Sequence, residues 1–362
     1  MKRARGGDCF CARESEPGAF GTRLRIRVRS FIGAVVLGVG LCGPAAAQSV
    51  TLRVADSFPA GHYVARYATS YWMEQTKKLA GGDIGFEYYP AEQLGKAKDM
   101  LSLVQTGVAD IGYIAPSYIS DKLPLSAVAE LPWTFSGACV GTAAFWRLAR
   151  PGGALDVREF KPLGVRLLFA LMLPPNQLVL SRSEFGGLAS LQGLKLRTSG
   201  AAKEILLRRL KAIPIQIAAP EIHEAMSRGT IDGMLIPLSS LGSYDLVRLS
   251  RVATFEENFG SFLITYGISE NRWKSLSPKI QDAMVKAGDE TTARACQLVD
   301  ADEAATREKI KAEGVKLIQL SAEDKKVVAA LSAEVAREWA LGLDQRGKGG
   351  TPVLQSFEGA LQ

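Results

Sequence analysis

The stretch GLKLRTSGAAKEILLRRLKAIPIQI, residues 193–217, changes its hydrophobic periodicity twice. Leucines alternate with Lys195 and Arg197 in its first part, which is the two-residue period of a strand with one buried face. Residues 202–210 carry apolar side chains at helical spacing, and residues 213–217 alternate again. The stretch therefore predicts a strand, a helix and a second strand, and Arg197 stands where the first strand ends.

The rest of the chain repeats this alternation of strands and helices. Further strands are predicted at residues 50–58, 84–90, 109–115 and 231–236. Further helices are predicted at residues 64–79, 96–106 and 220–228, with Gly or Pro residues at their ends. Strands that alternate with helices of about ten residues are typical of βαβ units on mainly parallel sheets, so we expect an α/β fold.

Two helix-to-strand junctions share a pattern. The segments QTGVADIGYIAP (105–116) and SRGTIDGMLIP (227–237) both contain a Gly, two residues, an Asp, an apolar strand and a Pro. The Gly suits the left-handed conformation that follows a helix end, and the Asp opens the strand with a capping side chain. The pattern indicates two similarly built lobes, and two independent turns of the same kind are the alternative.

The segment 277–314 indicates one long helix. It contains no proline after Pro278, and Gly288 is its only glycine before Gly314. A thin apolar stripe follows helical spacing and comprises Ile280, Met284, Ala287, Thr291, Ala295, Leu298 and Ala305. A helix of about 30 residues spans roughly 45 Å, more than one small domain, and would brace two lobes. The alternative is a pair of shorter helices broken near Gly288.

Residues 1–47 have the pattern of a secretory signal peptide. The basic stretch RLRIRVRS (23–30) leads into the apolar stretch FIGAVVLGVGLC (31–42) and then into the small residues GPAAA. An apolar stretch of about 12 residues is too short for a membrane span, which takes roughly 20. We expect cleavage after Ala47. A lipoprotein signal at Cys42 is the less favoured alternative, because the residue before this cysteine is not small.

The net charge of the chain comes largely from that segment. The full sequence has 44 Lys and Arg against 37 Asp and Glu, a net charge of +7. Residues 1–47 hold eight of the basic and three of the acidic residues, which leaves 36 basic and 34 acidic ones. A balance this even gives no basic patch or stripe, so we expect no nucleic-acid partner. The remaining length suits two α/β domains, each with its own core.

The cysteines leave one question open. Three of the five lie in residues 1–47, so that Cys139 and Cys296 remain. Two cysteines in a chain of this length are no disulfide framework, and the sequence does not decide whether they pair with each other.

Sequence motifs of catalysis and metal binding are incomplete. HEAMS (223–227) begins like the helix of a zinc protease, but Ser227 replaces the second histidine. GLDQRGKGG (342–350) approaches a phosphate-binding loop, but Gly349 replaces its Ser or Thr and no strand precedes it, so we expect a flexible tail. The sequence has no G-x-S-x-G motif. We therefore predict a protein that is not an enzyme and has no metal site and no cofactor.

Arg197 is the leading candidate for a binding residue. In open α/β sheets, ligands bind beyond the carboxyl ends of the strands, and helix N-termini attract anions. Arg197 stands at such a junction beside the hydroxyl groups of Thr198 and Ser199. Its guanidinium can hold a carboxylate through two parallel hydrogen bonds. The local pattern is equally compatible with a solvated surface arginine or a salt bridge between lobes.

Several stretches together resemble a known family, the extracytoplasmic solute-binding subunits of tripartite ATP-independent periplasmic (TRAP) transporters. These stretches are EYYPAEQLGKAKDMLSLVQTGVADIGYIAPSY (87–118), LSAVAELPWTF (125–135), LQGLKLRTSG (191–200), APEIHEAMSRGTIDGMLIPLSS (219–240) and ISENRWKSLSPKIQDAM (268–284). The resemblance covers nearly the whole chain after residue 47, and the order of the motifs is more specific than any one of them.

The resemblance implies a two-lobed periplasmic binding protein fold with mixed sheets, hinge strands and a long helix that spans both lobes. Lobe I would comprise residues 48–172 and about 260–296, and lobe II residues 173–259 and about 297–362. The lobes would close over an organic acid and deliver it to TRAP membrane permease subunits. The nearly invariant arginine that pairs with the solute carboxylate in this family falls on Arg197. We expect a periplasmic monomer.

Two departures from the family pattern bear on the solute. Asn176, in PPNQ, replaces a second basic residue, and Ile236, in DGMLIP, replaces a polar Asn. A second carboxylate would be buried without a partner, which is costly. We therefore predict a monocarboxylate with an apolar or aromatic body. The predicted ligand-binding residues are Arg197, Asn176, Ile236, Pro237, Ser239, Tyr113, Tyr118, Phe58 and Trp133, although aromatic residues are more often part of a core.

Two other functions compete with this prediction. A secreted α/β enzyme that acts on an organic acid would share the composition, but the chain after residue 47 has only two histidines and no nucleophile motif. The binding component of an ATP-driven (ABC-type) importer would share the type of fold. The segment 277–314 and the motif 191–200 favour the TRAP family over that alternative.

Overall fold

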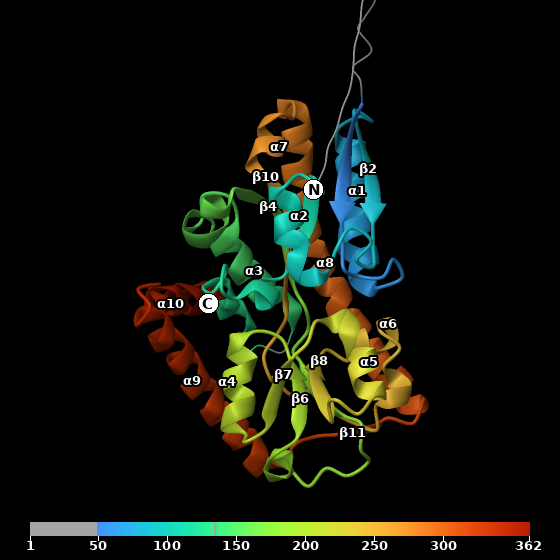
Figure 1. Cartoon of the computed structure of the whole chain (residues 1–362), viewed down its shortest axis with the longest axis vertical. Helices are drawn as coiled ribbons and strands as arrows, with labels where there is room; N and C mark the ends of the chain where they lie inside the picture. Colours follow the sequence, from blue (N-terminus) through green and yellow to red (C-terminus); the bar gives the residue numbers. More distant parts are fainter. Residues whose placement is uncertain (1–48, 134, 136) are drawn as a thin grey trace, which may run out of the picture. The chain divides into compact units, whose positions relative to one another are not determined.

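The computed structural model describes residues 49–133, 135 and 137–362, and the predicted signal peptide lies outside these residues. The described chain forms two mixed sheets (Figure 1). The strand order of the first sheet is β2-β1-β3-β10-β4. Its strands are β1 (Val50–Ala55), β2 (Ile84–Tyr89), β3 (Ile111–Ile114), β4 (Val165–Met172) and β10 (Leu263–Ser269). β10 is antiparallel to both of its neighbours, whereas β1 is parallel to β2 and β3.

The second sheet has the strand order β11-β9-β5-β8-β6-β7. Its strands are β5 (Gln177–Leu180), β6 (Lys195–Thr198), β7 (Ile213–Gln216), β8 (Gly233–Ile236), β9 (Val252–Thr254) and β11 (Lys316–Ile318). β6 is parallel to β7 and β8, while β5 is antiparallel to β8 and β9. The strands and helix predicted within residues 193–217 are thus confirmed as β6, a helix and β7.

Helices connect most of these strands. The α-helices are α1 (Tyr71–Leu79), α2 (Met100–Gln105), α3 (Ala138–Ala149), α4 (Ala201–Arg209), α5 (Ile222–Ser227), α6 (Ser240–Ser243), α7 (Glu270–Lys274), α8 (Pro278–Ala312), α9 (Ala322–Asp344) and α10 (Gly350–Leu361). A π-helical segment, Ala65–Ser70, leads directly into α1. Within the described residues, no helix is both long and apolar enough to cross a membrane.

The two junctions with a shared sequence pattern have the same structure in the two sheets. Asp110 and Asp232 each accept, through a side-chain oxygen, a backbone N–H from the neighbouring strand, that of Arg53 in β1 and that of Lys195 in β6, both at 2.8 Å. Each Asp backbone N–H in turn donates to the carbonyl oxygen of the same partner residue. The pattern therefore marks a repeated structural unit, in which the Asp side chain holds two parallel strands in register.

Two segments outside the strands carry the chain between the sheets. Residues 173–176 lead from β4 to β5, and residues 255–262 lead from β9 back to β10. The segments are hydrogen-bonded to each other, from the Leu173 N–H to the Phe262 carbonyl (2.9 Å) and from the Asn176 N–H to the Gly260 carbonyl (2.8 Å). These crossing segments correspond to the hinge strands that the family resemblance implies.

α8 is a single helix of 35 residues, so the alternative of two shorter helices is wrong. Gly288 does not break it but brings it close to β4, because a Cβ at this position would overlap the Leu168 carbonyl oxygen. The N-terminal part of α8 packs on α1, α3 and β4. Further along, Glu303 accepts backbone N–H groups from Leu238 and Ser239, which follow β8 of the second sheet. The helix therefore contacts both sheets (Figure 1).

Cys139 and Cys296 form a disulfide, with 4.8 Å between their Cα atoms. The bond joins the first turn of α3 to the middle of α8. Next to it, the Asp300 carboxylate accepts the Ala138 N–H at the start of α3 (2.8 Å). A covalent link and a helix cap therefore hold α3 against the helix that contacts both sheets. This answers the question that the sequence left open.

The prediction of a flexible tail at residues 342–350 is wrong. α9 continues to Asp344, and α10 begins at Gly350 after a short turn. The Asp344 carboxylate accepts the Thr351 N–H (3.1 Å), and Phe357 of α10 is fully buried. α10 packs on α3 and α9. The glycines that make this segment look flexible in the sequence provide the tight turn between two helices.

Candidate functional site

A small cavity lies where the crossing segments meet the carboxyl ends of strands from both sheets. We name it the inner cavity. It is lined by Phe58, Tyr118, Leu173, Asn176, Arg197, Ala219, Ile236, Pro237, Ser240, Tyr244 and Phe262. Phe58 follows β1 and Tyr118 follows β3, while Arg197 and Ile236 come from β6 and β8. The cavity has a volume of about 20 Å³, which is room for about one water molecule.

β6 holds the Arg197 side chain in a fixed place on the cavity wall. The strand is paired on one side with β7, where Arg197 faces Ile215, and on the other with β8, where it faces Met234. The guanidinium donates from Nε to the Ile217 carbonyl (2.8 Å) and from Nη1 to the Leu235 carbonyl (3.1 Å). Both acceptors are backbone atoms, so the orientation of the guanidinium is set by the sheet.

The third nitrogen of this guanidinium has no partner. Arg197 is only 3% exposed, and its Nη2 is buried without a hydrogen-bond acceptor among the described residues. No carboxylate in the described part of the chain forms an ion pair with it. A buried charge that lacks a counter-ion is unfavourable, and an anion in the cavity would compensate it.

The remaining walls of the inner cavity are mostly aromatic and apolar. Tyr118 packs against Phe262 with 5.3 Å between the ring centroids. Burial raises the pKa of Tyr118 and of Tyr244, and the nearby charge of Arg197 opposes this rise in both. The phenol groups therefore stay neutral, and each keeps its proton as a hydrogen-bond donor. Phe58 is fixed through its backbone N–H, which donates to the Asp56 carboxylate (2.9 Å).

His62 adds no charge near this site. Its ring stacks on Tyr63 (4.4 Å between centroids) and also packs against Phe58 (4.4 Å). Burial, with a smaller effect from the charge of Arg66, lowers the pKa of His62 to about 3. The imidazole is therefore neutral at ordinary pH, which leaves Arg197 as the charged group of the inner cavity.

The structure brings together six of the nine predicted ligand-binding residues. They are Phe58, Tyr118, Asn176, Arg197, Ile236 and Pro237, all on the wall of the inner cavity. Their role in binding stays a prediction, but their convergence follows from the topology. Asn176 lies on a crossing segment and Ile236 at the end of β8, and β5 and β8 are paired at this end through Gln177 and Ile236.

The other three predicted residues lie elsewhere. Tyr113 is buried behind Phe58, with 4.9 Å between their ring centroids. Trp133 donates from its indole nitrogen to the Val128 carbonyl (2.8 Å) and packs against Phe357 of α10. Ser239 is also buried, and Glu303 holds its backbone N–H. The structure thus places two of the predicted aromatic residues in the packed core rather than on the cavity wall.

Three polar or aromatic residues on the cavity wall escaped the sequence prediction. Ser240 is the first residue of α6, a short helix that follows Pro237, and Tyr244 is the residue after this helix. Phe262 lies on the second crossing segment. Phe262 could have been predicted, because a bulky aromatic residue close to a hinge is a candidate for contact with the solute. The segments of Tyr244 and Ser240 have no periodicity in the sequence that points to a cavity.

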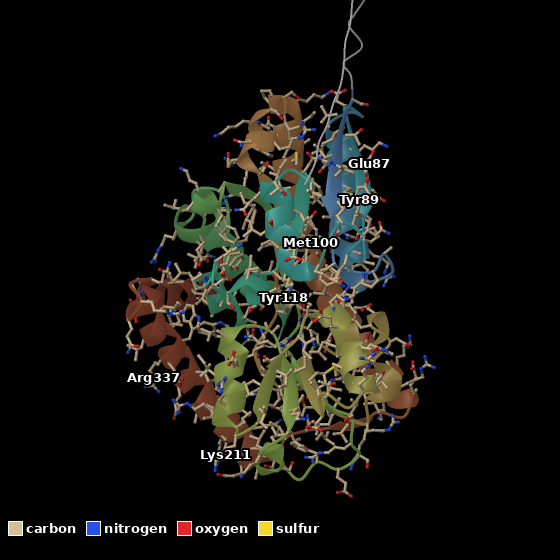
Figure 2. All side chains as sticks on the ribbon, viewed as in Figure 1. Glu87, Tyr89, Met100, Tyr118, Lys211 and Arg337 are labelled. Atoms are coloured by element: carbon tan, nitrogen blue, oxygen red, sulfur yellow. A yellow bond between two sulfur atoms is a disulfide. The ribbon has the colours of Figure 1, made fainter. Side chains whose placement is uncertain are left out.

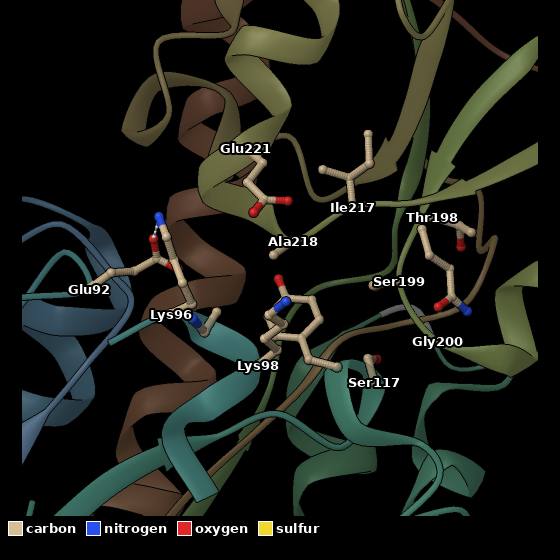
Figure 3. Close-up of a pocket in the computed structure, with 13 residues that line it drawn as sticks. Glu92, Lys96, Lys98, Ser117, Thr198, Ser199, Gly200, Ile217, Ala218 and Glu221 are labelled. Carbon is tan, nitrogen blue, oxygen red and sulfur yellow. Dashed lines mark hydrogen bonds and ion pairs between the residues drawn. The ribbon is translucent and has the colours of Figure 1, made fainter. Parts of the chain in front are cut away.

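A second, larger pocket shares Tyr118 with the inner cavity, and we name it the outer pocket. Figure 3 shows residues that line it. It has a volume of about 260 Å³ and is lined by Glu92, Lys96, Ala97, Lys98, Ser117, Tyr118, Thr198, Ser199, Gly200, Gln216, Ile217, Ala218 and Glu221. Glu92 and Lys96 pair with each other at 2.8 Å. Charges of both signs line this pocket, so its size alone does not make it the better site for an anion. The buried, unpartnered guanidinium belongs to the inner cavity.

Two tyrosines form hydrogen bonds between elements of the two sheets, each with a residue that lines the inner cavity. The Tyr118 hydroxyl, from the segment after β3, accepts the Ala219 N–H after β7 (2.9 Å). The Tyr63 hydroxyl, from the segment after β1, is hydrogen-bonded to the Ser240 hydroxyl (3.1 Å). Figure 2 shows Tyr118 at the boundary where the elements around the first sheet meet those around the second. Separating the two sheets would require both bonds to break.

A fully buried ion pair lies behind the cavity wall. The Lys203 Nζ of α4 is 3.4 Å from Glu130 Oε2 and donates to the Ser261 carbonyl (2.6 Å). Glu130 also accepts the Leu263 N–H (2.9 Å) and the Ser117 hydroxyl. Burial lowers the pKa of Lys203, and Glu130 opposes this effect. The pair therefore joins α4 to a crossing segment through Ser261, to β10 through Leu263 and to the segment after β3 through Ser117.

Comparison with known proteins places this architecture in a family. The sequence profile described as "Bacterial extracellular solute-binding protein, family 7" (DctP) matches residues 54–341. The C4-dicarboxylate-binding periplasmic protein DctP of Rhodobacter capsulatus is 25% identical over 282 residues, which is 73% of this chain and 78% of that protein.

Two solved structures share both the fold and part of the sequence. A TRAP solute-binding protein from Rhodoferax ferrireducens T118, in complex with copurified benzoate, is 26% identical, with a TM-score of 0.80 over 86% of this chain and 98% of that one. A TRAP periplasmic solute-binding protein from Bordetella bronchiseptica, with bound (R)- and (S)-mandelate, is 25% identical, with a TM-score of 0.78 over the same shares.

These likenesses confirm the predicted two-lobed fold, in which each lobe is built on one of the two sheets. The family consists of solute receptors rather than enzymes. The profile covers most of the described chain, including both crossing segments and Arg197. The chain belongs to the bacterial extracellular solute-binding protein family 7, the DctP family of TRAP solute-binding proteins.

Proposed function

We propose that this protein captures a monocarboxylate with an aromatic or apolar body between its two lobes in the periplasm and delivers it to TRAP membrane subunits. It acts as a receptor, without chemistry on the solute. The observation that carries the proposal is the buried Arg197, whose Nη2 has no partner in a cavity with otherwise neutral walls. One carboxylate satisfies this nitrogen and compensates its charge.

The composition of the cavity wall supports a solute with one acidic group. Asn176 and Ile236 occupy the positions where the family pattern has a second basic residue and a polar amide, and both line the inner cavity. A second carboxylate would meet Tyr118, Phe262 or Ile236 instead of a cation, and its burial without a partner is unfavourable. The benzoate and mandelate complexes of the two related structures agree with an aromatic monoacid.

Binding on this account requires the lobes to open and close. A cavity of about 20 Å³ does not admit an aromatic acid in this conformation. We assign residues 48–172 and about 260–296 to lobe I, and residues 173–259 and about 297–362 to lobe II. The motion would bend the two crossing segments, and it would break the bond from Tyr118 to Ala219 and the bond between Tyr63 and Ser240.

Calorimetric titration of the protein without residues 1–47 tests this function. Aromatic monoacids, with mandelate and phenylacetate as probes, should bind at least about tenfold more tightly than succinate or malate, because the dicarboxylates bury an unpaired charge. Mandelamide is the matched control for the carboxylate and should give no measurable heat. Tight binding of succinate or malate, together with no binding of the monoacids, would show that the assigned solute class is wrong.

A further inference from the structure

Three buried polar atoms around the inner cavity lack hydrogen-bond partners within the described residues. They are Nη2 of Arg197, Oδ1 of Asn176 and the hydroxyl oxygen of Tyr244, and all three residues line the cavity. Asn176 is 2% exposed, so its amide oxygen is shielded from bulk water. Buried polar atoms are nearly always paired in folded proteins. These three atoms therefore indicate which hydrogen-bonding groups the bound solute carries.

A carboxylate alone does not provide hydrogen-bond partners for all three of these atoms. Its oxygens only accept hydrogen bonds, so they can pair with the Arg197 guanidinium and with the phenol O–H of Tyr244. In the orientation that the structure gives the Asn176 amide, its buried and unpaired atom is the oxygen, which only accepts hydrogen bonds and which a donor from the solute would pair. An acid without a donor would leave this oxygen buried and unpaired, and that costs binding free energy.

We infer that the solute is a 2-hydroxy acid whose hydroxyl group donates to Asn176 Oδ1 while its carboxylate pairs with Arg197. This inference rests on the proposed function and narrows its solute class. Asn176 and Arg197 line the same inner cavity, and a 2-hydroxy acid carries its hydroxyl group and its carboxylate on neighbouring carbon atoms, so one small solute can reach both residues. Asn176 is then the residue that selects for the hydroxyl group.

The position of Asn176 fits this role. Its backbone is already engaged, since its N–H donates to the Gly260 carbonyl and its carbonyl accepts the Phe259 N–H. These bonds fix the residue on the crossing segment and do not involve its side chain. A change of the side chain therefore alters the polar wall of the cavity and leaves the hydrogen bonds of the hinge in place.

A cycle of two ligand changes and one side-chain change tests the inference by calorimetry. The wild-type protein should bind mandelate at least about tenfold more tightly than phenylacetate, which lacks only the hydroxyl group. Phenylglyoxylate carries a carbonyl acceptor instead of that donor, and it should bind no better than phenylacetate. In Asn176→Leu, mandelate and phenylacetate should bind with affinities within about twofold of each other, because the selecting acceptor is gone.

The outcomes separate this inference from the function on which it rests. Equal affinities of the wild-type protein for mandelate and phenylacetate would overturn the role of Asn176 but leave an aromatic-acid receptor. A persistent preference for mandelate in Asn176→Leu would assign the selection to another residue and also overturn the inference. Failure of both acids to bind, with tight binding of succinate, would refute the proposed function itself. The melting temperature of the ligand-free variant should be unchanged or higher, since a buried unpaired oxygen has been removed.

Discussion

Arg197→Met should abolish the rise in melting temperature that an aromatic monoacid produces in the wild-type protein. Methionine keeps an unbranched, flexible side chain but removes the charge and the donor of the inner cavity. Loss of one partner from a buried, hydrogen-bonded charge pair costs about 2–5 kcal/mol. The affinity should therefore fall by about 30-fold to several thousand-fold. Thermal shift and calorimetry with mandelate measure both effects.

The ligand-free Arg197→Met variant should have a free energy of unfolding within about 2 kcal/mol of the wild type, because the removal of an unpaired buried charge offsets the loss of its hydrogen bonds to the Ile217 and Leu235 carbonyls. Arg166→Met is the matched control. Arg166 forms an ion pair with Glu270 at 3.0 Å and does not line the inner cavity. Its substitution should leave the affinity for mandelate unchanged. If mandelate still stabilises Arg197→Met as strongly as the wild type, Arg197 is not the residue that holds the carboxylate.

Lys203→Met should lower the free energy of unfolding by about 3–5 kcal/mol. The substitution leaves the Glu130 carboxylate buried without its cation, and it removes the bond from Nζ to the Ser261 carbonyl. Urea unfolding curves, extrapolated to water, measure the change. Since the ion pair lies behind Phe262, which lines the inner cavity, the variant should also bind mandelate less tightly.

An exposed ion pair of the same helix provides the control for this prediction. Arg208 and Glu204 of α4 pair at 2.6 Å on the surface, and Arg208→Ala should cost at most about 0.5 kcal/mol. The double variant Lys203→Met with Glu130→Gln should recover part of the lost stability, because no buried charge is left uncompensated. Equal effects of Lys203→Met and Arg208→Ala would mean that the buried pair does not hold these segments together.

Local sequence patterns were sufficient to predict most of the regular elements. The periods of residues 193–217 correspond to β6, α4 and β7, and the absence of proline between Pro278 and residue 314 corresponds to the continuous α8. The two Gly-x-x-Asp junctions could be found in the sequence because each depends on a short segment with a defined turn and cap. The position of Arg197 at the end of β6 follows from the same local period.

The features that depend on distant parts of the chain could not be predicted in this way. The partners of Lys203 lie 73 and 58 residues away, and the partner of Cys139 lies 157 residues away. The sequence prediction places Trp133 at the cavity as one of the aromatic residues that would contact an apolar solute, although such residues are more often part of a core. Its actual contact with Phe357 depends on α10, which the sequence pattern did not reveal as a helix. Similarly, only the packing of α6 brings Tyr244 to the cavity wall.

A crystal structure of the protein with bound mandelate tests the central claim most directly. We predict a carboxylate oxygen within about 3 Å of Arg197 Nη2, with the aromatic ring against Tyr118 and Phe262 between the two lobes. Mandelate in the outer pocket, or a carboxylate directed away from Arg197 in the inner cavity, would contradict the account.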